Sequence, residues 1–254
     1  MLRFFRHIRK KILFSDNIRK YVLYALGEIF LVMIGILLAL QVNNWNENRK
    51  ERNLENRYLH RLAADLEKDI ESFSRSLNAN ESRKKRAEFL LEAVDSSGLV
   101  SEEPTYFIES IEYAGYTYDP VISDHIFEEI KSSGRLAIIQ NEELRTALST
   151  YYSTLNNRDQ FNFIRQEFQI DYLKFSRGIL LPEQQIGVGS FSSSETYSPE
   201  EAMQAYKRMM AKPEFLEILP ITIQSKTRTS EVLDRFKDQA ELLRAMIINQ
   251  LNEL

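Results

Sequence analysis

The chain has 254 residues, 43% of them hydrophobic, with 8 glycines, 6 prolines and a formal net charge of −4. Scarce glycine and proline, with abundant Glu, Lys, Arg, Leu and Ile, favour helix over sheet. The absence of cysteine excludes disulfides, thiolate zinc sites, iron–sulfur clusters and cysteine nucleophiles.

The first 20 residues form a basic arm. Seven Lys or Arg against one acid give the arm a formal charge of +6, so the remaining chain carries −10. An acidic domain argues against nucleic acid as a partner, whereas a basic arm beside a membrane favours anionic lipid. The arm is either an amphipathic helix in the membrane interface or a disordered tail held by charge. The residues expected to contact lipid headgroups are Arg3, Arg6, Arg9, Lys10, Lys11, Arg19 and Lys20.

Residues 21–42, YVLYALGEIFLVMIGILLALQV, are nearly all apolar and contain one carboxylate, Glu28. As a helix they are roughly 33 Å long, enough to cross the hydrocarbon core of a bilayer. The segment is longer than the hydrophobic region of a signal peptide and no small-residue cleavage site follows it, which predicts an uncleaved signal anchor. The basic arm favours a cytoplasmic N-terminus and a periplasmic C-terminal domain. Tyr21, Tyr24 and Trp45 are the expected interfacial anchors.

One narrow face of this predicted transmembrane helix carries its charge. On a helical wheel Glu28, Gly35 and Ala39 fall within about 40° of one another. Gly35 and Ala39 have the small-xxx-small spacing that lets two helices approach closely. Three interpretations of Glu28 remain open: a protonated glutamate in a helix–helix contact, a snorkelling side chain without a role, and a proton-handling carboxylate in a larger complex. The third resembles, in architecture only, the single-pass subunits of ion-driven motors.

The run YVLYALGEIFLVMIGILLALQVNNWNE resembles the anchor of an uncharacterised family of single-pass membrane proteins from Gram-negative bacteria, known as a domain of unknown function. A looser likeness continues through Pro120-Val121-Ile122-Ser123, Ser132-Ser133-Gly134 and Tyr151-Tyr152. The resemblance implies an inner-membrane location and no particular activity. The residues that carry it are Gly27, Glu28, Ile29, Gly35, Ile36, Ala39, Leu40, Gln41, Asn43, Asn44, Trp45 and Asn46.

The rest of the chain predicts helices alone. Apolar residues at steps of three or four indicate one long helix over residues 47–96, part of a juxtamembrane stalk over 43–98. Further helices are expected over residues 101–113, from Ser123 to before Gly134, and from an Asn141 cap to about residue 175. A Gly/Ser-rich loop over 178–198 precedes a helix that starts at Ser198-Pro199 and a last helix with a candidate break at Pro220. We therefore expect an all-α protein, with residues 99–254 and the stalk in an antiparallel bundle of about six helices.

The candidate chemical sites are weak. His125, Glu128 and Glu129 share a helix face that could hold a metal, but a solvated acidic face fits the pattern better. The aromatic residues of 106–118 read as core rather than as a ligand pocket, and Gly187-Val188-Gly189 lacks the context of a phosphate loop. No catalytic, cofactor or metal residues are expected.

The predicted function is a non-enzymatic periplasmic scaffold anchored in the inner membrane. It would act through contacts with copies of itself or with another membrane protein. The alternatives are a subunit of an ion-coupled complex with Glu28 as its titrating group and an extracytoplasmic ligand-binding domain.

Overall fold

The computed structural model describes residues 18–157, 159–189 and 195–253. These residues form α-helices and one short 3-10 helix, without a strand, which confirms the all-α class. The chain divides into two units, residues 1–55 and 56–254. Five of the expected headgroup residues lie outside the described residues, namely Arg3, Arg6, Arg9, Lys10 and Lys11.

Helix α2 runs from Ile18 to Asp95 without interruption. The predicted transmembrane helix and the predicted long helix are therefore one helix, because neither glycine nor proline occurs between Gly35 and Gly98 to break it. Its C-terminus at Asp95 agrees with the predicted stop.

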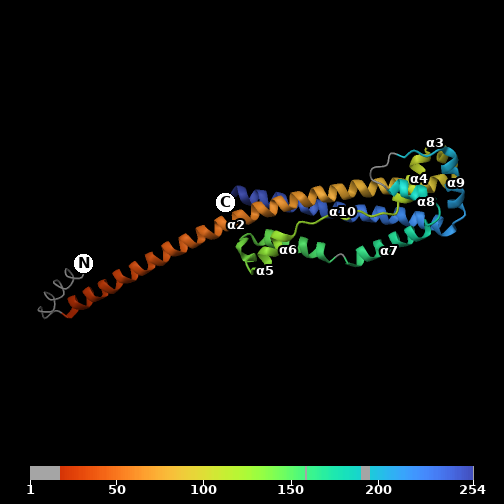
Figure 1. The fold of residues 1–254 in the computed structure, drawn as a ribbon. Coiled ribbons are helices and arrows are strands. Elements are labelled where there is room, and N and C mark those ends of the chain that lie inside the picture. Colours follow the sequence, from red (N-terminus) through yellow and green to blue (C-terminus); the bar gives the residue numbers. More distant parts are fainter. Residues whose placement is uncertain (1–17, 158, 190–194, 254) are drawn as a thin grey trace. The chain divides into compact units, whose positions relative to one another are not determined.

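Within the second unit, α2 and α10 (Pro213–Glu253) run side by side and antiparallel (Figure 1). The Phe73 ring stacks on Phe236 with centroids 6.1 Å apart. The Asn80 side chain donates a 2.7 Å hydrogen bond to the carbonyl of Lys226. Helices α6 (Glu142–Asn156) and α7 (Asp159–Phe175) pack on α10. Burial of apolar stripes on these long helices supplies most of the stabilisation of the unit.

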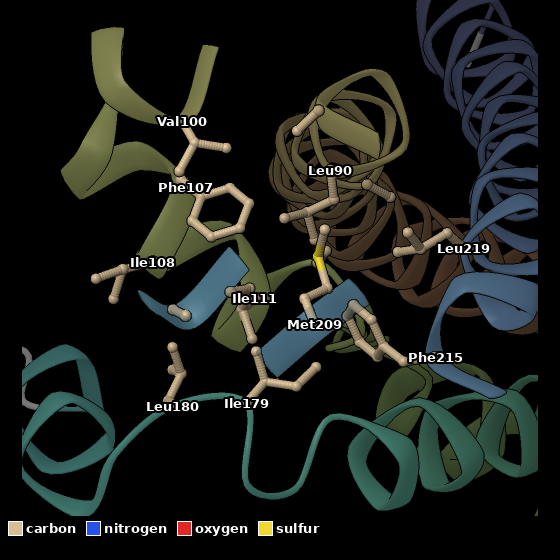
Figure 2. Packing of buried hydrophobic residues seen from close by; sticks show 14 of the residues in the cluster. Leu90, Val100, Phe107, Ile108, Ile111, Ile179, Leu180, Met209, Phe215 and Leu219 are labelled. Atoms are coloured by element: carbon tan, nitrogen blue, oxygen red, sulfur yellow. The ribbon is translucent and has the colours of Figure 1, made fainter. Parts of the chain in front are cut away.

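Four short helices form an apolar core with one end of this pair: α3 (Gly98–Glu102), α4 (Pro104–Tyr113), α8 (Pro182–Gly189) and α9 (Pro199–Met210). Figure 2 shows Leu90, Phe107, Ile111, Met209 and Phe215 converging there.

Several predicted boundaries change. The helix over 101–113 is two helices, because Pro104 starts α4 and Glu103 before it leaves helical geometry. The helix expected up to residue 175 is divided, because α6 ends at an Asn-rich sequence whose side chains compete for the backbone.

The predicted loop 178–198 contains α8, with Pro182 at its first position. Pro220 does not break α10. Burial of Ile218, Leu219 and Thr222 on both sides of the proline holds the helix together.

Helix α5 (His125–Ser132) and the 3-10 helix η1 (Leu136–Ile138) complete the bundle. Asp124, and not Ser123, occupies the N-cap position of α5. Asn141 caps α6 as predicted, because its side chain accepts a 3.1 Å hydrogen bond from the N–H of Leu144.

Candidate functional site

The first candidate site is the apolar part of α2. Among the described residues one helix is long and apolar enough to cross a membrane, and none of its apolar stretch is buried. Glu28, Gly35 and Ala39 all lie in this exposed stretch of α2. A methyl group on Gly35 would meet nothing within 4 Å. All three residues expected to form the contact face are thus exposed within this unit.

The expected interfacial residues lie at both ends of this stretch. Trp45 is 65% exposed, and the guanidinium carbon of Arg49 lies 5.9 Å from the centre of its ring. Tyr24 is half-buried and Arg19 is exposed. The side chains of Lys20 and Tyr21 lie outside the described residues.

The second candidate site is a polar seam inside the bundle. Between α4 and α5 the chain leaves helical structure over residues 114–124, here called the connecting segment. It crosses a stripe of buried polar side chains on α2 with steps of four, three, four and four residues: Asp65, Asp69, Ser72, Ser76 and Asn80. The hydroxyl of Ser72 accepts a 2.8 Å hydrogen bond from Val121 N–H, and Asp69 Oδ1 accepts a 2.7 Å bond from Ser123 N–H. Side chains of α2 thus satisfy the backbone of the connecting segment.

The acidic end of the seam is centred on Asp69. Its Oδ2 accepts a hydrogen bond from the Tyr151 hydroxyl at 3.1 Å. Burial raises the pKa of the Asp69 carboxyl to about 6, although the hydrogen bonds from Ser123 and Tyr151 oppose the rise. Tyr151 and Tyr152 meet edge to face, and Phe127 stacks on Tyr152 with ring centroids 4.5 Å apart. This end is therefore a buried carboxylate that accepts hydrogen bonds from Ser123 and Tyr151.

The His125 and Glu128–Glu129 face does not gather into a metal site. His125 Nε2 lies 3.6 Å from Asp65 Oδ2, while Glu128 pairs with Lys131 at 3.0 Å. Glu129 pairs with a different partner, Arg61, at 3.1 Å. Across residues 18–157, 159–189 and 195–253, no three His, Asp or Glu residues are grouped to hold a metal ion.

The basic end of the seam holds two buried cations. Lys226 of α10 is 3% exposed and Arg165 of α7 is 5% exposed. Lys226 Nζ donates to the carbonyl of Tyr116, and Arg165 pairs with Asp119. Burial lowers the pKa of the Lys226 ammonium to about 7, and the nearby guanidinium groups of Arg83 and Arg165 contribute.

The aromatic residues of 106–118 mostly make packing contacts. Tyr106 meets Phe89 edge to face at 4.9 Å, and the Arg86 guanidinium lies 4.6 Å from the centre of the Tyr106 ring. Phe107 is fully buried. Tyr118, at the other end of the run, is exposed.

The polar seam was not predicted from the sequence, although the sequence contains one signal for it. The buried polar residues of α2 repeat with helical periodicity beside the apolar stripe, and such a second stripe indicates that something polar packs on the helix. No local pattern identifies Arg165 or Lys226, because their neighbours come from distant parts of the chain.

The fold and the two sites define a class of protein: an all-α chain whose described residues include one helix apolar and long enough to cross a membrane, and a helical bundle that contains a polar seam. The chain belongs to the Family of unknown function (DUF6090), whose model matches residues 28–182. The match begins at Glu28 in the apolar stretch and runs to the start of α8. No curated protein and no solved structure matches the chain.

Proposed function

We propose that this chain is a single-pass inner-membrane protein that acts through protein contacts and is not an enzyme. One observation carries the proposal: the apolar stretch of α2 is not covered by the rest of the chain. Side chains such as Leu23, Ile29 and Leu31 are exposed there. At about 25 cal/mol per Å² of apolar surface, contact with water would be strongly unfavourable, and a bilayer removes that cost.

The contact face of the proposal is the Glu28, Gly35 and Ala39 stripe. Two copies packed through Gly35 and Ala39 would let the backbones approach closely. The same contact would bring Glu28 out of the lipid and against a partner helix. A homo-oligomer is therefore the partner that this face fits best, with a second membrane protein as the alternative.

Cysteine cross-linking tests the face, because the chain has no cysteine of its own. Gly35→Cys in native membranes is expected to form a disulfide-linked dimer under mild oxidation. Leu38→Cys and Met33→Cys, which lie off the stripe, are the matched controls. Cross-links at the two control positions but not at Gly35 would show that this stripe is not the contact face.

A variant at Glu28 tests whether the protein acts through contacts or as a subunit of an ion-coupled complex. The Glu28→Gln variant keeps hydrogen bonding but cannot titrate. A contact role predicts near-normal cross-linking through Gly35→Cys and normal function in the cell. Normal assembly combined with loss of function would instead favour an ion-coupled subunit, as would co-purification of a polytopic partner.

The proposed orientation has its own test. Cysteines placed singly at Ser15 and Ser133 should report opposite sides of the inner membrane, with Ser133 periplasmic. A membrane-impermeant thiol reagent added to intact spheroplasts is expected to label Ser133→Cys but not Ser15→Cys. Labelling of Ser15→Cys alone would reverse the orientation.

A further inference from the structure

The basic end of the seam contains a small, partly open cavity. Its volume is about 10 Å³, which is room for about one water-sized sphere. Each of three parts of the chain contributes to the lining. Gly115 and Thr117 come from the connecting segment, Arg165 and Gln169 from α7, and Ser225 and Lys226 from α10.

Among the ion pairs of residues 18–157, 159–189 and 195–253, cations outnumber carboxylates at this cavity. Within the described part of the chain, Lys226 forms no ion pair with a carboxylate, and its Nζ donates a hydrogen bond to the neutral carbonyl of Tyr116. The carboxylate of Asp119 pairs with Arg165, and the Asp119 side chain is 57% exposed on the solvent side. In the part of the chain that the structure describes, the ion pairs thus set one carboxylate against two buried cations.

A third cation adds to the excess of positive charge near the cavity. Arg83 of α2 is half-buried and close enough to depress the pKa of Lys226. Its buried Nε and Nη1 atoms have no hydrogen-bond partner among the described residues. The neighbouring Arg86 pairs separately with Glu109 at 2.9 Å.

Buried charge of one sign requires compensation. Lys226 can release its proton, or an anion can enter the cavity. An anion could use hydrogen-bond donors that are already present. An ammonium has three donors, and the Tyr116 carbonyl accepts only one of them.

We propose that this cavity binds a small monovalent inorganic anion of halide size, held by the ammonium of Lys226 and the guanidinium of Arg165. The small volume favours a monatomic anion, because phosphate and sulfate each have five heavy atoms. The bound anion joins the connecting segment to α7 and α10, so it stabilises the assembled bundle.

Chloride is the probe for the test, with the full chain in mild detergent. Gluconate replaces chloride at constant ionic strength and pH, so that screening does not change. The Tm of the wild-type protein is expected to rise by about 3–6 °C for each tenfold increase in chloride above its dissociation constant. This rise should be lost in Lys226→Met and kept in Arg228→Met, which removes an exposed charge two residues along the same helix.

Equal Tm values in chloride and gluconate would overturn the proposal, and so would an undiminished chloride response in Lys226→Met. If Lys226→Met does not fold, chlorine NMR of the wild-type protein provides the second measurement. A bound anion predicts excess chloride line broadening that added bromide removes in a saturable way. No excess broadening, or broadening that bromide leaves unchanged, would show that the cavity does not hold the anion.

Discussion

Asp69 is fully buried, unlike an ordinary surface carboxylate. Its pKa of about 6 in the native protein is above the ordinary value of 3.8. Between about pH 4 and pH 6 the native state therefore holds a proton that the unfolded chain has released, so stability falls as the pH rises through this window. Asp69→Asn keeps an acceptor for Ser123 N–H and cannot titrate. We therefore expect the free energy of unfolding of this variant not to fall between pH 4 and pH 6, whereas that of the wild-type protein falls by up to about 2–3 kcal/mol.

Urea unfolding at several pH values between 4 and 7 measures this difference. Glu71→Gln, two residues along α2 on an exposed side chain, is the matched control and should retain the wild-type slope. Asp69→Ala removes both hydrogen bonds and should cost about 2–4 kcal/mol near pH 4, and less at higher pH because this variant cannot titrate either. Parallel pH profiles for Asp69→Asn and the wild-type protein would contradict the assignment.

Gly115 is required by the close approach of Tyr172. A Cβ atom at this position would lie 2.1 Å from Tyr172 Cδ1. The Tyr172 ring is buried and its hydroxyl donates a 3.0 Å hydrogen bond to the carbonyl of Ile111, so the ring cannot move without loss. We expect Gly115→Ala to destabilise the protein by about 1–3 kcal/mol in urea unfolding. Gly98→Ala, where the added methyl meets nothing within 4 Å, should be close to neutral.

At the scale of the element, α9 depends on the capping box at its N-terminus. Ser198 Oγ accepts a 3.3 Å hydrogen bond from Glu201 N–H, and Glu201 Oε2 accepts a 2.8 Å bond from Ser198 N–H. Ser198→Ala should cost about 1 kcal/mol. Because the two bonds are reciprocal, Glu201→Ala should cost less in the Ser198→Ala background than in the wild-type protein. A double-mutant cycle from urea unfolding checks this, and additive costs would show that the two side chains act independently.

For the whole molecule, the division at residues 55 and 56 predicts that the bundle does not need the apolar stretch. A chain that begins at Asn43 should remain in solution without detergent and unfold cooperatively, because it lacks the exposed apolar side chains of 22–42. The full chain, in parallel, should require detergent. Circular dichroism and sedimentation measure both properties. Aggregation of the shorter chain would show that the apolar stretch helps to cover the bundle.

Local sequence patterns are sufficient to predict the all-α class, the apolar stretch of α2 and the helix caps at Asn141 and Ser198. Each of these features depends on residues within one or two helical turns, so composition and periodicity reveal it. Single prolines were less reliable as signals of where a helix begins or ends. Pro104 begins α4 inside the helix predicted over 101–113, Pro182 begins a helix where a loop was predicted, and Pro220 lies inside α10 because buried neighbours hold the helix around it.

The polar seam was decided by tertiary structure alone. The pKa of Asp69 is raised because the folded bundle buries the carboxyl, and Lys226 lies near Arg165 only because α10 packs on α7. A buried charge is defined by what surrounds it in space, and for these residues the surroundings come from distant parts of the chain. The sequence places the protein at a membrane as a prediction, whereas the cavity between α7, α10 and the connecting segment can be found only in the folded bundle.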